Sequence, residues 1–86
     1  MGWRVIIIVE IKSDIVIKHW IEIIEWLAEN VGKCFSYNLT QEMIKRTNLE
    51  TFISNDSDYM ITNPISHYNF HFKNSEKAML FKLIWA

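Results

Sequence analysis

Residues 13–32 read SDIVIKHWIEIIEWLAENVG, and every other predicted element needs the apolar face of this stretch to complete a core. Ser13 is a good N-cap, Asp14 suits the positive end of the helix dipole, and Gly32 stands where helices commonly end. Between them, apolar residues recur with the i, i+3/i+4, i+7 spacing of an amphipathic helix. This spacing predicts one continuous helix over residues 13–32. The predicted core face consists of Ile17, Trp20, Ile21, Ile24, Leu27, Ala28 and Val31.

The same helix carries a second, narrower stripe, which is formed by Val16, His19, Ile23 and Trp26. A single amphipathic face does not require this stripe. Either the buried face of the helix is broad, or the stripe is a surface for a partner. We therefore treat His19, Ile23 and Trp26 as candidate interaction residues and keep both interpretations open.

Residues 3–11, WRVIIIVEI, are dense in β-branched side chains and predict a strand before the helix. Alternate residues of a strand point to opposite faces, so Ile7 and Val9 should face the helix. The opposite face carries Ile6 and Ile8 in its middle. That pattern is typical of a strand whose two faces are both covered.

A second strand is predicted over residues 34–39, CFSYNL. Residues 48–64 read mainly as a long loop, in which residues 59–62, YMIT, could add a few strand residues. Residues 67–73, HYNFHFK, alternate most clearly, with three aromatic rings on one face. Residues 75–85, SEKAMLFKLIW, then predict a helix capped by Asn74 or Ser75, with a terminal strand over 81–86 as the alternative.

The resulting order, βαββα, predicts an α+β fold of the ferredoxin-like (split βαβ) type, with the helices on one face of an antiparallel sheet. We expect a single domain over residues 1–86, because 86 residues suffice for only one. A chain of this size buries roughly 60–65% of the surface that its unfolded form exposes. Half of the residues are apolar, so there are more apolar side chains than one small core can hide. This surplus predicts a homo-oligomer.

Charge and cysteine content exclude several classes of protein. The net charge is −1 and no basic stripe is present, which argues against a nucleic-acid partner. No segment approaches the ~18 apolar residues of a membrane span, so we expect no membrane association. Cys34 is the only cysteine, which excludes an internal disulfide and fits a reducing compartment such as a cytoplasm.

No motif for catalysis, a cofactor or a metal is recognisable. His67 and His71 share a strand face but lie roughly 13 Å apart at ~3.3 Å per residue, too far for one zinc ion with ~2.1 Å bonds. We expect no cofactor and no metal. The main alternative is a small enzyme whose site lies at a subunit interface and uses Glu10, His71 or Tyr37. A second alternative is a nucleic-acid-binding module that stacks bases on its strand aromatics.

The open face of the predicted sheet is the main candidate interaction surface. Ile6 and Ile8 lie on it, and His67 and His71 occupy the equivalent side of the neighbouring strand. Two isoleucines facing water in the middle of a sheet would be covered if two such faces packed together. We therefore expect self-association through these four residues.

The C-terminal segment carries a family resemblance. Tyr68-x-Phe70-x-Phe72, followed by the residues Ala78-x-Leu80-Phe81-Lys82-Leu83-x-Trp85, resembles the ending of small uncharacterised accessory proteins of tailed phages, including marine, cyanophage-type ones. The resemblance implies phage origin, a location in the host-cell cytoplasm, and a host protein as a further partner. The expected function is that of a small non-enzymatic binding or regulatory protein that acts through protein–protein interaction.

Overall fold

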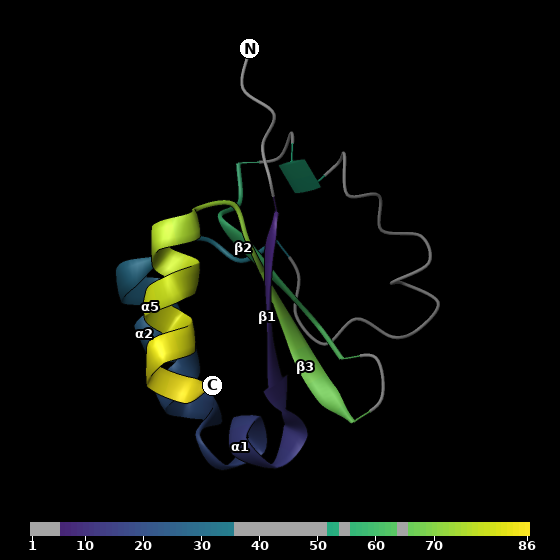
Figure 1. Ribbon diagram of the computed structural model, residues 1–86. Helices are drawn as coiled ribbons and strands as arrows, with labels where there is room; N and C mark the ends of the chain where they lie inside the picture. The colour runs from purple at the N-terminus through teal and green to yellow at the C-terminus, as the bar shows by residue number, and fades with distance from the viewer. Residues whose placement is uncertain (1–5, 36–51, 54–55, 64–65) are drawn as a thin grey trace.

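The helices and strands were located in a computed structural model, which describes residues 6–35, 52–53, 56–63 and 66–86. In chain order the elements are β1 (Ile7–Lys12), α1 (Ser13–Lys18), α2 (Trp20–Asn30), β2 (Tyr59–Thr62), β3 (His67–Phe72) and α5 (Ser75–Trp85). Figure 1 shows α2 and α5 side by side on one face of the sheet. The prediction of an α+β fold with helices on one face of an antiparallel sheet is therefore confirmed.

The sheet of the described residues has three strands in the order β1-β3-β2, and both pairings are antiparallel. β1 and β2 thus run parallel to each other on either side of β3. Val9 pairs with Phe70, and Phe70 pairs with Ile61 on its other side. Because directly paired residues point to the same face, this register confirms that the β3 aromatics and the Val9 side of β1 both face the helices.

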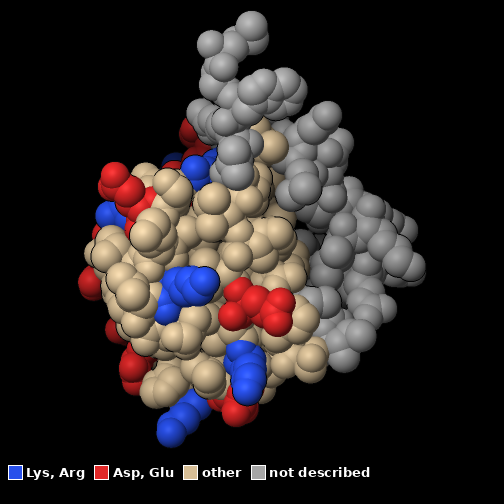
Figure 2. Space-filling model, viewed as in Figure 1, with Lys and Arg blue, Asp and Glu red and all other residues tan. Residues whose placement is uncertain are grey.

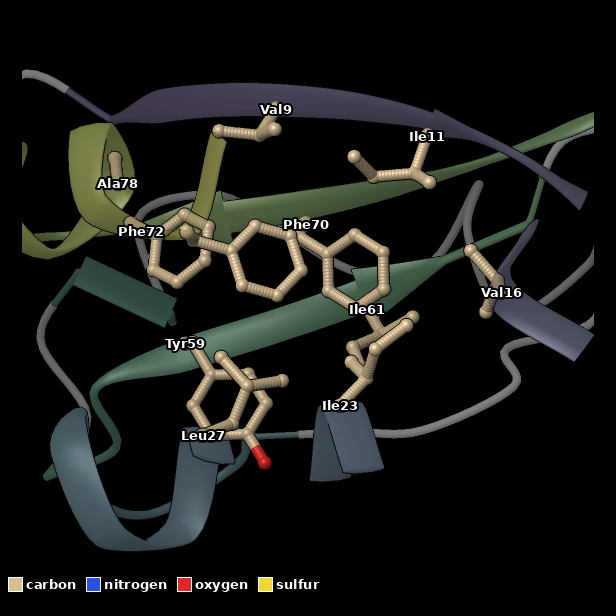
Figure 3. Packing of buried hydrophobic residues seen from close by; sticks show 11 residues of the cluster. Val9, Ile11, Val16, Ile23, Leu27, Tyr59, Ile61, Phe70, Phe72 and Ala78 are labelled. Atoms are coloured by element: carbon tan, nitrogen blue, oxygen red, sulfur yellow. The ribbon is translucent and has the colours of Figure 1, made fainter. Parts of the chain in front are cut away.

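The core lies between this sheet face and the helices, as Figure 3 shows. Phe70 and Phe72 of β3 lie at its centre, and their rings lie 4.6 and 5.2 Å from the ring of Phe81 on α5. The buried members of the cluster are Val9, Ile11, Val16, Ile23, Leu27, Tyr59, Ile61, Phe70, Phe72, Ala78 and Phe81. Each element therefore contributes at least one fully buried side chain to a single core.

The predicted core face of the first helical stretch is only partly correct: Leu27 is buried and Trp20, Ile24 and Val31 pack against the core, but the other three residues do not. Ile17 and Ile21 are 68% and 71% exposed and Ala28 is also exposed, whereas Ile23 and Leu27 are completely buried. The helix is also interrupted, because His19 leaves the helical conformation and separates α1 from α2. The buried face is rotated by roughly a quarter of a turn from the predicted one, at 100° per residue.

Contacts with α5 explain this rotation. The Trp26 ring packs against Phe81 at 5.8 Å and against Trp85 at 5.5 Å, so α2 turns its Trp26 side inward. Of the candidate interaction residues on this stripe, Ile23 is completely buried in the core, and Trp26 is partly buried against it. The apolar arc of this helical stretch is wider than the face that the sheet can cover, and Ile17 of α1 and Ile21 of α2 are left outside.

The second strand of the described sheet is Tyr59–Thr62, within the region that predicted a loop. All four of its residues are buried. Of the strand predicted over residues 34–39, Cys34 forms an isolated parallel bridge with Tyr59, and residues 36–39 lie outside the described residues. The expectation that residues 59–62 could add a short strand within this region is therefore confirmed.

Gly32 and Asp58 hold the chain at the edge of β2. The Asp58 carboxylate accepts a hydrogen bond from the Lys33 N–H at 2.9 Å, and the Asp58 N–H donates to the Lys33 carbonyl at 2.7 Å. Gly32 has a φ of 132° and passes so close to Asp58 that a Cβ would overlap its carboxylate. Only glycine fits here, and the prediction that Gly32 ends the helix is confirmed.

The last helix agrees with its prediction. The Asn74 side chain accepts a hydrogen bond from the Lys77 N–H at 3.2 Å and caps α5. The helix continues to Trp85, so the alternative of a terminal strand is wrong. Figure 1 places α5 in front of α2, next to β1.

Candidate functional site: exposed apolar surfaces

The largest group of exposed apolar side chains lies on the outer side of α5. Ala78 and Phe81 are buried beneath the helix and Trp85 packs against the core, yet the four other large apolar residues of α5 are exposed. The exposed fractions are 65% for Met79, 46% for Leu80, 80% for Leu83 and 52% for Ile84. A helix that is apolar on all sides is normally buried on all sides. We call these four residues the α5 apolar face.

Figure 2 shows a broad uncharged area on the side of the molecule that carries α5 and β1, interrupted by only a few charged side chains. Fully burying a side chain such as Leu or Met is worth about 1.5–3 kcal/mol. Four such side chains on two successive turns of one helix form a continuous strip rather than scattered exposures. Sequence reasoning missed this strip, although the large number of apolar residues in SEKAMLFKLIW signalled it.

A smaller apolar area lies where α1 meets α2. Ile17 and Ile21 are exposed there and border an open hollow of about 450 Å³ that is lined by consecutive residues 17–22. His19 lies in this hollow, with its Nδ1 3.5 Å from the Glu22 carboxylate. A hollow lined from one side by two turns of helix cannot enclose a reacting group, so it offers no catalytic pocket.

The open sheet face differs from its prediction. The register places Ile8 directly opposite His71, so the predicted sharing of one face is confirmed. However, Ile6 packs against Phe52 and Met60 in a second small cluster, and His71 is only 8% exposed. Ile8, at 55% exposed, is the one large apolar side chain that the described part of this face leaves uncovered. The apolar interaction surface expected on this face is therefore reduced to the side chain of Ile8.

Polar groups on this face are partly paired. His71 Nε2 and Thr62 Oγ1 are hydrogen-bonded at 2.9 Å, whereas His71 Nδ1 is buried without a partner among the described residues. Burial lowers the pKa of His71 below its ordinary value, because the charged imidazolium would lose its hydration. His67 Nε2 lies 3.5 Å from the carboxylate of Glu10, which is well exposed.

These positions bear on the enzyme and nucleic-acid alternatives. Glu10 lies opposite Asn69 and next to His67, so the described residues do not pair it with His71, and Tyr37 lies outside them. Phe70 and Phe72 are completely buried under the helices and cannot stack on bases. Within residues 6–35, 52–53, 56–63 and 66–86, no group of three or more possible ligands could hold a metal ion.

We expect the stability of the protein to fall as the pH drops below about 6.5, the ordinary pKa of histidine. Because burial lowers the pKa of His71 in the folded state, the unfolded chain binds more protons there as the pH falls, and stability rises with pH wherever the unfolded state binds more protons. The free energy of unfolding should change by up to about 1.4 kcal/mol per pH unit in this range. Above pH ~7.5 it should no longer depend on the protonation of His71. Urea unfolding, followed by tryptophan fluorescence between about pH 7.5 and 5.5, measures it.

The control variant removes the titratable ring of His71. His71→Gln should flatten the profile. If His71→Gln keeps the parent slope, the buried neutral state of His71 is not the cause of the pH dependence.

No family model, curated protein or solved structure matches this chain significantly. Among the helices of the described residues, none has the length and apolar character needed to cross a membrane. Among the exposed apolar surfaces of the described residues, the α5 apolar face has the most large apolar side chains.

Proposed function

We propose that the protein is a small non-enzymatic binding protein that acts through protein–protein interaction and self-associates through the α5 apolar face. The observation that carries this proposal is the exposure of Met79, Leu80, Leu83 and Ile84 on a helix whose other side is already in the core. Interfaces concentrate their binding energy in a few large side chains that become fully desolvated. This face offers such side chains without any change in the fold.

The phage origin implied by the C-terminal resemblance stays part of the proposal. It places the protein in the cytoplasm of a host cell and adds a host protein as a possible second partner of the same face. The α5 helix supports self-association and binding of a host protein in the same way, because the segment that carries the resemblance also supplies the exposed side chains.

We further propose that the fold is ferredoxin-like. The order β1-β3-β2, with β3 inserted between two strands that run parallel to each other, supports a split βαβ unit. The helices α2 and α5 on one face support it as well. A complete pattern has a fourth strand beside β1, and the described residues supply none there.

Substituting Leu83 by Glu tests the proposed surface. We expect the parent to be a dimer or larger at micromolar concentration and Leu83→Glu to be a folded monomer, because a charge would have to be desolvated in the interface. Light scattering gives the mass, and circular dichroism confirms the fold.

The matched control is Ile21→Glu, which places the same charge on an equally exposed isoleucine outside the α5 apolar face. It should associate as the parent does. A parent that stays monomeric overturns self-association, and a Leu83→Glu variant that associates like the parent overturns the assignment of this face.

A further inference from the structure

The open sheet face carries a small cluster of buried side chains that is separate from the main core. Phe52 and Met60 are buried in it, and Ile6 packs against them. Met60 points to this face because it pairs with His71, whereas the main core lies on the other face, between the sheet and the helices. We call Phe52, Met60 and Ile6 the open-face cluster. A cluster with so few buried contacts opens at a lower free energy than the main core, because the rest of the fold does not have to separate.

His71 lies at the border of the open-face cluster. It pairs with Met60 on β2 and with Ile8 on β1, and directly paired residues point to the same face of a sheet. The imidazole is buried, its Nε2 is hydrogen-bonded to Thr62 Oγ1, and its Nδ1 has no partner among the described residues. A protonated ring in this position would hold a desolvated charge between two apolar side chains and would leave one N–H unpaired.

No charged group of the described residues forms an ion pair with His71. The charged or titratable groups that share this face on β1 and β3, or that precede β2, are Glu10, Lys12, Asp56, Asp58, His67 and Lys73. Lys73 holds its Nζ 4.7 Å from the centre of the Phe52 ring, so a positive charge already borders the open-face cluster. The Glu10 carboxylate is well exposed beside His67, and the Asp58 carboxylate accepts a hydrogen bond from a backbone N–H. Strand β2, YMIT, carries no charged side chain.

We propose that proton uptake by His71 releases Phe52 and Met60 from the open sheet face while the main core stays folded. This switch is independent of the α5 apolar face and of self-association. Opening returns the imidazolium to water and disrupts only the open-face cluster, whereas global unfolding would also expose the main core. Because burial lowers the pKa of His71, the open state binds more protons than the closed state as the pH falls. The ratio of open to closed molecules should therefore rise by up to about ten-fold per pH unit below pH ~6.5.

Oxidation of methionine by hydrogen peroxide measures this opening. Met60 is 2% exposed, so its sulfur should react mainly from the open state. The protein is treated with dilute peroxide between about pH 7.5 and about pH 5, and peptide mass spectrometry gives the initial rate of oxidation at Met60. Free N-acetylmethionine in the same sample corrects for the effect of pH on the reagent. We expect the corrected rate at Met60 to be constant near pH ~7.5 and to rise by up to about ten-fold per pH unit below pH ~6.5.

Two variants supply the controls. Leu27→Met places a reporter in the main core, where Leu27 is completely buried and where exchange of leucine for methionine conserves volume. The introduced methionine should react at least about ten-fold more slowly than Met60 at each pH, because only global unfolding exposes it. His71→Gln removes the titratable ring and should make the rate at Met60 independent of pH.

A rate at Met60 that does not change with pH overturns the proposal. An unchanged pH profile in His71→Gln also overturns it, because another group would then control the opening. Equal rates at Met60 and at the methionine of Leu27→Met would mean that the whole domain unfolds and that the opening is not local. This last comparison needs no substitution at His71, so it stays decisive if circular dichroism shows that His71→Gln does not fold.

Discussion

Substituting Phe81 by Ala is expected to lower the free energy of unfolding by about 3–5 kcal/mol, the range for removing a buried phenylalanine ring. The Phe81 side chain is completely buried and contacts aromatic rings of both the sheet and α2. Its ring lies 4.6 Å from Phe70 of β3, 5.8 Å from Trp26 of α2 and 5.1 Å from Trp85. Ala would leave a cavity that these rings cannot fill. Since small domains are stable by only about 5–15 kcal/mol, this substitution should remove a large share of the stability.

Lys82→Ala is the matched control, because Lys82 follows Phe81 directly on the same helix, is exposed and does not belong to the α5 apolar face. We expect its effect to stay within about 0.5 kcal/mol, as is usual for surface positions. Urea unfolding of both variants, followed by circular dichroism at one protein concentration, makes the comparison, because association adds to apparent stability. Equal losses at the two positions would show that α5 does not present Phe81 to the core.

Substituting Ile23 by Ala is expected to cost about 2–5 kcal/mol, because the side chain lies completely buried between α2 and the sheet. Ile21→Ala should change stability by less than about 0.5 kcal/mol. The two residues have the same side chain and the same helix, and they differ only in the direction in which they point. Their difference in unfolding free energy therefore measures the rotation of α2 directly.

Ile24→Ala extends this comparison. Ile24 was assigned to the centre of the core by its spacing, but the structure leaves it partly exposed at the edge of the cluster. We expect a loss between those of the other two variants. A larger loss for Ile21→Ala than for Ile23→Ala would restore the core face predicted from the sequence and reject the packing of Trp26 on α5.

The candidate site was only partly predictable. Alternation correctly placed Ile8 and His71 on one face of the sheet, because the register of β1 with β3 follows from which residues must face the helices. It did not show that Ile6 packs against Phe52 and Met60, since Phe52 is more than forty residues away in the chain. Nor did it show that α5 keeps four apolar residues outside the core. A residue's exposure depends on what packs against it, and that information is not local.

By itself, the amino-acid sequence determined the elements whose signal is local and strong. The alternation of residues 67–73 specified β3 and its two faces, because a strand has a period of two and only two sides. Asn74 and Gly32 marked helix ends through short-range backbone chemistry.

Tertiary structure alone decided the rest. The apolar arc of α2 is wide enough to be buried in more than one orientation, and the rings of Phe81 and Trp85 selected the one that buries Ile23 and exposes Ile21. β2 became a strand because its four residues fit between β3 and the Gly32–Cys34 segment. The physical reason is common to both cases: hydrophobic burial is non-directional, so the choice among apolar faces depends on the shape of the neighbouring side chains.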